Sequence, residues 1–169
     1  MPRITRDSLL TLEAYALERK DFRARVLAHK KHRSVHLGDH VTLLFEDELD
    51  AYNPLVPDGS NFKATMLIEY EDAEERRVAL ARLKGIEDRV WIEVEGCGRV
   101  HAIADEDLER ENEQKTSSVH FLRFELTAEM VAALKYGVAL GMGIDHPNYS
   151  TSIPAVSAAI RTALVADLA

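Results

Sequence analysis

The chain has 169 residues, 46% hydrophobic and 30% charged, a balance typical of one globular domain with a sizeable core. Its formal net charge of -8 argues against a surface for duplex nucleic acid, because neutralising phosphates requires clustered Lys and Arg side chains. Cys97 is the only cysteine, which excludes an intramolecular disulfide, and no stretch approaches the roughly 18 apolar residues of a membrane span. We therefore expect a soluble, cytoplasmic protein without nucleic-acid or membrane partners.

The N-terminal part predicts two helices. Apolar residues recur at helical spacing over about residues 5–18, and the pattern restarts at Asp21. The basic run from His29 to Arg33 is typical of the solvated last turn of a helix, where cations complement the helix dipole. We expect this helical part to end at about residue 33.

A hairpin and an ordered loop follow. Two runs rich in β-forming residues, at 34–37 and 40–46, surround Gly38-Asp39, a dipeptide suited to a two-residue turn. Residues 47–60 contain two prolines and a Pro-Asp-Gly sequence, which favour fixed turns.

The centre of the chain carries the clearest periodicity. Residues 61–70 alternate apolar and polar side chains, which predicts a strand with one core face. Asp72 can cap a helix that ends at Gly85, and two strands, of about residues 90–95 and 99–104, follow around a glycine-rich turn.

The last part begins with a highly charged segment, 105–117, which predicts an exposed short helix and loop. Residues 118–126 alternate as another strand, and Thr127 can cap the next helix. A run of small residues then leads to the turn at His146, and Pro154 suits the first position of a last helix reaching about Leu168.

These elements predict an α+β fold. We expect a mostly antiparallel sheet of five or six strands with helices packed mainly on one face. Residues 1–169 form a single domain in this interpretation, with a helical part at about 5–33 and a sheet-containing body at 34–169.

Several stretches together resemble a known family: TRDSLLTLEAY, VTLLFE, ELDAYNPLVPDGSN, KATMLIEY, GIEDRVW, IADEDLER, KTSSVHFLRFEL and DHPNY. They are similar to an uncharacterised bacterial family, a domain of unknown function that is often encoded beside rubrerythrin and a heterodisulfide-reductase-like iron-sulfur protein. The resemblance covers nearly the whole chain. It implies a role near redox or oxidative-stress metabolism, with rubrerythrin or an iron-sulfur oxidoreductase as protein partners.

The chain departs from the family pattern at one place. Family members usually carry a further helical stretch between the LLFE strand and the ELDAYNP loop, whereas here Glu46-Asp47 runs straight into Glu48-Leu49. Either the chain has a deletion or a segment is missing near Glu46 to Glu48. An alpha-carbon separation much above about 3.8 Å at this point would show missing residues.

Histidines are the first candidates for a metal site. His101, His120 and His146 lie on or beside separate predicted strands and could converge in space. Strand histidines are more often hydrogen-bonded core or edge residues, and no motif with metal-ligand spacing supports them. The sequence indicates no particular cofactor.

The polar face of the predicted sheet is the second candidate. If the strands neighbour one another, carboxylates and cations surround one indole ring, and the face is either solvated or the lining of a ligand pocket. Its candidate ligand-binding residues are Lys63, Glu69, Trp91, Glu93 and Arg123.

Two functional hypotheses follow. The first is a non-catalytic accessory or interaction protein linked to redox metabolism, and a homo-oligomer stays open. The alternative is a small-molecule or metal-binding enzyme that uses the polar sheet face and the Asp145-His146 loop. Its candidate catalytic residues are His120, Arg123, Asp145 and His146. This alternative requires His146 to reach His120, Arg123 or Glu69 directly or through a water molecule.

Overall fold

The computed structural model describes residues 20–21, 24, 26–47 and 56–169. The first predicted helix lies outside the described residues, as does the junction after Asp47 at which a missing segment was considered. No helix within the described part of the chain is long and apolar enough to cross a membrane.

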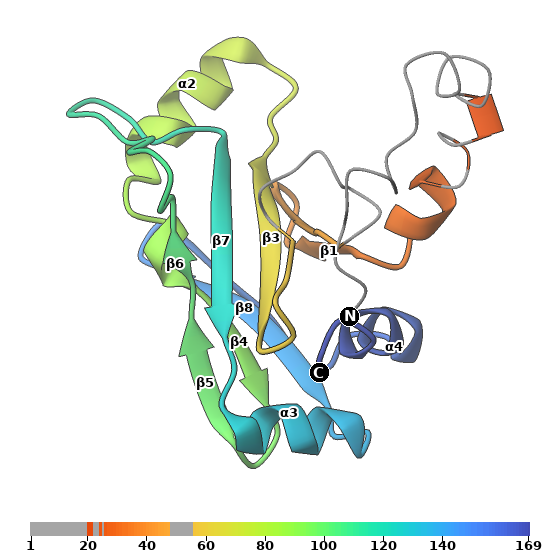
Figure 1. Cartoon of the computed structure of the whole chain (residues 1–169). Coiled ribbons are helices and arrows are strands. Elements are labelled where there is room, and N and C mark those ends of the chain that lie inside the picture. The colour runs from red at the N-terminus through yellow and green to blue at the C-terminus, as the bar shows by residue number, and fades with distance from the viewer. Residues whose placement is uncertain (1–19, 22–23, 25, 48–55) are drawn as a thin grey trace.

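The strands form two antiparallel sheets (Figure 1). The five-stranded sheet has the order β1-β2-β3-β7-β6, with bounds Ser34–Leu37, Val41–Phe45, Asn61–Ile68, Val119–Glu125 and Ile103–Ala104. The four-stranded sheet has the order β5-β4-β8-β9, with bounds Gly98–His101, Val90–Val94, Leu140–His146 and Tyr149–Ile153. The predicted α+β class and antiparallel pairing are confirmed, and the strands are divided between two sheets.

The core lies between the inner faces of the two sheets. Met66 and Ile68 of β3, like Ile92 and Val94 of β4, belong to one cluster of buried apolar side chains, as their alternation predicts. Phe45 adds aromatic contacts with Phe62 and Phe124. Burial of one face of each sheet fixes the register of the strands, because a shift by one residue would expose every core side chain.

Two links tie the sheets together. Ala102 alone separates β5 from β6, so the chain passes from one sheet to the other within a single residue, and its amide donates to the Val90 carbonyl at 2.9 Å. On the other side, the hydroxyl of Tyr149 in β9 donates to the Leu37 carbonyl at 2.6 Å and accepts from the amide of His40 at 3.1 Å. The result is a sandwich joined at both edges.

Strands β8 and β9 correct the prediction of a small-residue run and a turn for this stretch. Glycine has low strand propensity, and the two glycines of β8, Gly141 and Gly143, make this strand hard to predict from the sequence. Gly143 in β8 faces the ring of Trp91, and a Cβ atom there would lie 2.3 Å from the indole. The small residue is therefore required by tertiary packing.

Three helices in the C-terminal two-thirds of the chain begin at side-chain caps: α2 (Ala73–Arg82), α3 (Ala128–Lys135) and α4 (Ala158–Val165). Asp72 and Thr127 cap α2 and α3, as predicted. The predicted start of the last helix at Pro154 is wrong, because Ser157 is its cap. In Figure 1, α2 and α3 lie at opposite ends of the sandwich.

The segment 105–117 forms turns and irregular chain, so the short helix predicted there is wrong. A 3-10 turn, η3 (Glu87–Arg89), precedes β4. The segment and η3 together hold the polar residues of the site described below.

The interpretation of the basic run as a solvated helix end holds for Lys31 and His32, which are exposed, and needs correction at Arg33. Arg33 is 4% exposed and makes two hydrogen bonds, of 2.6 and 2.8 Å, to the carboxylate of Asp167 just beyond α4. Its Nε atom lies 3.0 Å from Asp47, whose carboxylate also contacts His29. A buried charge needs a partner, and here the partners come from the two ends of the described chain. The ion-pair cluster therefore holds the segment after α4 against the start of β1.

Candidate functional site

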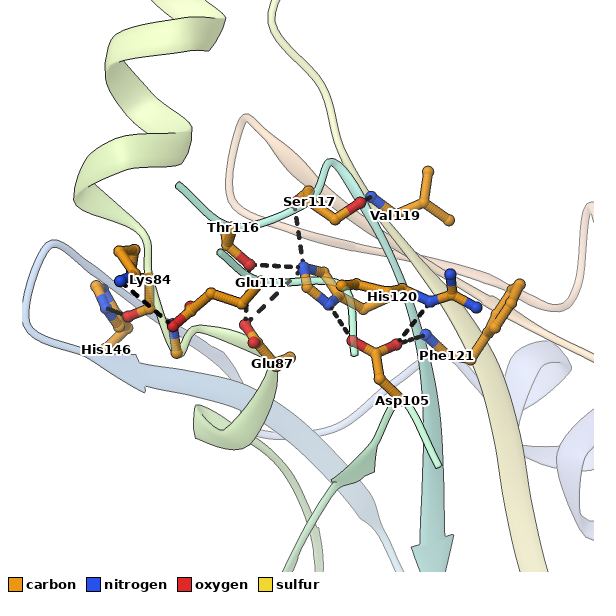
Figure 2. Close-up of polar contacts among 12 residues, drawn as sticks. Lys84, Glu87, Asp105, Glu111, Thr116, Ser117, Val119, His120, Phe121 and His146 are labelled. Carbon is orange, nitrogen blue, oxygen red and sulfur yellow. Dashed lines mark hydrogen bonds and ion pairs between the residues drawn. The ribbon is translucent and has the colours of Figure 1, made fainter. Parts of the chain in front are cut away.

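The turn at His146 caps the end of α2 (Figure 2). His146 is buried, its Nε2 atom lies 3.0 Å from the Lys84 carbonyl, and its Nδ1 atom accepts from the amide of Asn148 at 3.2 Å. The Asn148 side chain donates to the Arg82 carbonyl at 2.8 Å. The carbonyl of Arg82, the last residue of α2, and that of Lys84, just beyond the helix cap, are thus satisfied. Figure 2 shows Glu111 and Glu87 between His146 and His120, and the described contacts of His146 include none with His120, Arg123 or Glu69.

The predicted polar face is divided between the two sheets. Lys63 and Arg123 are opposite each other on β3 and β7, whereas Trp91 and Glu93 lie on β4 of the other sheet. Glu69 lies just beyond β3 and accepts from the Thr42 hydroxyl at 2.8 Å. The candidate ligand-binding residues therefore do not form one surface.

On the four-stranded sheet, the outer face is organised by Arg99. Its guanidinium lies 3.7 Å from the centroid of the Trp91 ring, which suits a cation–π contact. Arg99 also donates to Glu93 at 2.5 Å and to Asp145 at 3.4 Å. Asp145 therefore lies on the surface of this sheet in a partly exposed ion pair. His101 of β5 is opposite Trp91 and is exposed.

Arg123 also has an ion-pair role. It makes hydrogen bonds of 2.7 and 2.8 Å to Glu106 and contacts Glu125. The hydrogen bonds with Glu106 raise the pKa of the Arg123 guanidinium, so this side chain stays charged.

Of the candidate histidines His101, His120 and His146, it is His120 that belongs to a cluster with metal-binding groups, at the junction of the two sheets (Figure 2). It lies near the start of β7, while Asp105 follows β6 and Glu87 lies in η3, just before β4. One potential ligand atom from each of the three lies within 4.8 Å of the others. Among the described residues this is the group with a metal-binding arrangement, and His101 and His146 are outside it.

Asp105 holds one side of the imidazole. Its Oδ2 atom lies 2.6 Å from Nδ1 of His120, and its Oδ1 atom accepts from the Phe121 amide at 2.9 Å and from Arg110 at 3.0 Å. Asp105 has a φ of 48°, a left-handed conformation that Asp adopts more readily than most residues. Because a carboxylate accepts hydrogen bonds, this contact places the imidazole proton on Nδ1.

Oxygen atoms surround the other nitrogen of the imidazole. The Thr116 hydroxyl lies 3.0 Å from Nε2 of His120, the Ser117 carbonyl 3.1 Å and the Glu87 carboxylate 3.9 Å. The same hydroxyl lies 3.3 Å from Glu87. Three oxygens of different kinds therefore lie around Nε2.

The charge of Glu87 is poorly compensated. The residue is 8% exposed, and within the described part of the chain no Lys or Arg lies within ion-pair distance of it. Asp105 is paired with Arg110 and Glu111 with Lys84. Burial raises the pKa of the Glu87 carboxyl, because the charged form is poorly solvated there.

The order Asp105–His120–Thr116 matches that of a carboxylate–histidine–hydroxyl catalytic triad. Thr116 is however only 1% exposed, and its amide donates to the Leu80 carbonyl at 3.1 Å. A substrate could not approach this hydroxyl without moving the chain. The geometry favours a role that requires no external substrate.

A second polar region lies around Tyr70, which is shared by two open cavities of about 520 and 820 Å³. We call the two cavities together the Tyr70 groove. The ring of His40 stacks on Tyr70 with centroids 3.9 Å apart and an angle of 13° between the planes. The walls come from the β1–β2 turn, the residues after β3, and α2.

Negative charge dominates the Tyr70 groove. Six carboxylates and two arginines line it, which leaves four more negative than positive groups: Asp39, Glu69, Glu71, Asp72, Glu74 and Glu75 against Arg76 and Arg82. Burial is the main cause that raises the pKa of the Tyr70 hydroxyl, and the negative charge of Glu75 adds to it.

Sequence reasoning singled out His120 but missed Glu87, Asp105 and Thr116. These three lie in GIEDRVW, IADEDLER and KTSSVHFLRFEL, three of the stretches on which the family resemblance rests. Those stretches were the available signal, and the fold brings them together.

A family model described as "Protein of unknown function (DUF3501)" matches residues 3–49 and 46–168. The chain belongs to this family. The break between the two matched segments falls where the sequence departs from the family pattern. No functionally curated protein matches the chain significantly.

A crystal structure from Burkholderia pseudomallei K96243, titled a novel protein of unknown function, is similar to this DUF3501 chain at 51% sequence identity. The match has a TM-score of 0.89 and covers 98% of this chain and 99% of that one. The fold is therefore shared with a solved relative.

Proposed function

We propose that the protein is a non-catalytic accessory protein that binds a Lys- or Arg-containing segment of a partner protein in the Tyr70 groove. The observation that carries this proposal is the stacked pair of His40 and Tyr70 beside a surplus of four carboxylates. Aromatic faces attract ammonium and guanidinium groups, and neighbouring carboxylates pair with them.

Three carboxylates of the groove are free to receive a cation. Asp39, Glu71 and Glu75 are exposed, and none of their side-chain carboxylates makes a hydrogen bond or ion pair with another described residue. The cavity volumes fall within the roughly 300–1,000 Å³ range of ligand sites, enough for a few side chains of a docked segment.

The partner class is the second part of the proposal. The family resemblance supports a bacterial, cytoplasmic role beside redox proteins such as rubrerythrin or an iron-sulfur oxidoreductase. The enzyme alternative draws less support, because His146 caps a helix, Asp145 and Arg123 make surface ion pairs, and His120 belongs to a separate buried cluster.

Fluorescence anisotropy with labelled hexa-arginine, hexa-lysine and hexa-glutamate peptides tests the groove. We expect the basic peptides to bind and Glu71→Gln/Glu75→Gln to weaken binding about five-fold, since each exposed ion pair contributes up to about 0.5–1 kcal/mol. The control Glu109→Gln/Glu129→Gln removes two exposed carboxylates outside the groove, so its net charge equals that of Glu71→Gln/Glu75→Gln.

Equal weakening in the two double variants would show that net charge alone attracts the peptides and would refute the groove. Tyr70→Leu separates the aromatic contribution, because it keeps an apolar side chain and removes the ring. Binding of purified rubrerythrin, compared between the wild type and Glu71→Gln/Glu75→Gln, then tests the partner class.

A further inference from the structure

We propose that Nε2 of His120, the Glu87 carboxylate, the Thr116 hydroxyl and the Ser117 carbonyl bind one divalent first-row transition-metal ion at the junction of the two sheets. This metal site is independent of the Tyr70 groove and of any partner. It would make the buried cluster in Figure 2 a metal centre.

The spacing of the ligand atoms suits an ion. Nε2 of His120 is 3.0, 3.1 and 3.9 Å from the oxygens of Thr116, Ser117 and Glu87. Two ligands on one ion, each bonded at about 2.1 Å, lie about 3.0 Å apart at right angles and about 3.4 Å apart in a tetrahedron. Small side-chain rotations therefore complete the coordination, with no movement of a strand.

The far side of the imidazole is already prepared for ligation. Histidines that bind metals usually donate their other ring N–H to a carboxylate, which fixes the tautomer and the ring orientation. Asp105 makes this contact at 2.6 Å and is itself held by Arg110 and the Phe121 amide. We assign Asp105 as a positioning residue and not as a ligand for this reason.

The electrostatics also favour a bound cation. Buried charges are normally paired or bound to metals, yet the Glu87 carboxylate accepts hydrogen bonds from neutral donors, the Thr116 hydroxyl among them, and has no Lys or Arg partner among the described residues. Pairing of Asp105 with Arg110 and of Glu111 with Lys84 leaves Glu87 as the carboxylate without a fixed cation. A bound ion supplies the missing positive charge.

The donor types indicate the class of metal. One imidazole with carboxylate, hydroxyl and carbonyl oxygens suits Mn²⁺, Fe²⁺ or Zn²⁺, whereas Cu(I) prefers thiolates and thioethers. Cys97 lies in the β4–β5 turn and is not in the group. Ca²⁺ and Mg²⁺ prefer sites made of oxygen alone, so the imidazole argues against them.

The test uses the whole chain purified without an affinity tag. Metal content by mass spectrometry, calorimetric titration of the chelator-treated protein with Mn²⁺, Fe²⁺ under anaerobic conditions and Zn²⁺, and the visible spectrum of a Co²⁺-loaded sample are measured. We expect one ion per chain and a Co²⁺ spectrum without thiolate charge-transfer bands.

Variants assign the ligands. Glu87→Gln keeps the size of the side chain and its hydrogen bond with Thr116, and should weaken binding at least 100-fold. Asp105→Asn should weaken it about 10- to 100-fold, the range for residues that orient a ligand. His101→Gln, which changes an exposed histidine outside the cluster, should leave binding unchanged.

Absence of saturable one-to-one binding by the folded wild type would overturn the proposal. So would equal affinities of the wild type and Glu87→Gln, or loss of binding in His101→Gln. Far-ultraviolet circular dichroism of each variant checks that it is folded. Loss of peptide binding in the Tyr70 groove has no bearing on these results.

Discussion

Asp105→Asn isolates the contribution of the buried carboxylate at the sheet junction. The change keeps the shape of the side chain and its tolerance of positive φ, but puts an amide beside Nδ1 of His120 and removes the charge paired with Arg110. Hydrogen bonds to charged groups contribute about 1.5–3 kcal/mol each. Weakening two of them should lower the free energy of unfolding by about 2–4 kcal/mol.

Asp107→Asn is the matched control, because Asp107 pairs with the same arginine at 2.6 Å but has a side chain that is 52% exposed, against 10% for Asp105. An exposed ion pair should contribute less than about 1 kcal/mol. Urea unfolding in the presence of EDTA, followed by the fluorescence of Trp91, measures both, since Trp91 is the only tryptophan. Equal losses in the two variants would refute the argument that burial makes Asp105 important.

Three further predictions concern stability. Ile92→Ala should cost about 2–5 kcal/mol by opening a cavity in the core, and Glu93→Ala less than about 1 kcal/mol, because its ion-pair partner is 46% exposed; comparable losses in thermal unfolding would overturn the assignment of faces. Arg33→Met should cost about 3–5 kcal/mol in urea unfolding, because it leaves two carboxylates buried, and a loss below 1 kcal/mol would contradict that account. Burial raises the native pKa of Glu87, so between about pH 4.3 and that native pKa the metal-free native state keeps a proton that the unfolded chain releases. The bound proton stabilises the native state, and this stabilisation is lost as pH rises through that range. Glu87→Gln should flatten that fall and be more stable than the wild type at pH 7 in EDTA; identical pH profiles would argue against a buried carboxyl.

The features that the sequence predicted correctly are those that depend on residues close together in the chain. The alternation in β3 and β4, the caps Asp72 and Thr127, and the positive φ of 70° at Gly38 agree with the structure. Each of these features is decided within a few residues, by side-chain direction or by a single backbone conformation. The predicted two-residue turn at Gly38-Asp39 is wrong by one residue, because Leu37 pairs with Val41 and the loop spans residues 38–40.

The parts that were missed depend on contacts between distant residues. From the sequence alone, Gly143 argues against a strand. In the structure, Trp91 of the neighbouring strand packs against it, and only glycine leaves room for the ring. Likewise, Glu87, Asp105 and His120 come from a 3-10 turn and two strand ends, and one sequence does not show that they meet. The buried Arg33 shows the same limit, because its partner Asp167 is near the other end of the chain.

The single residue between β5 and β6 has a consequence for local opening of the fold. The Ala102 amide is hydrogen-bonded to Val90 in one sheet, and the next residue, Ile103, already pairs with Arg123 in the other. Any fluctuation that frees this amide must loosen an edge of both sheets at once. Amide protons on the two edges should therefore exchange with deuterated solvent as one cooperative unit, although they belong to different sheets.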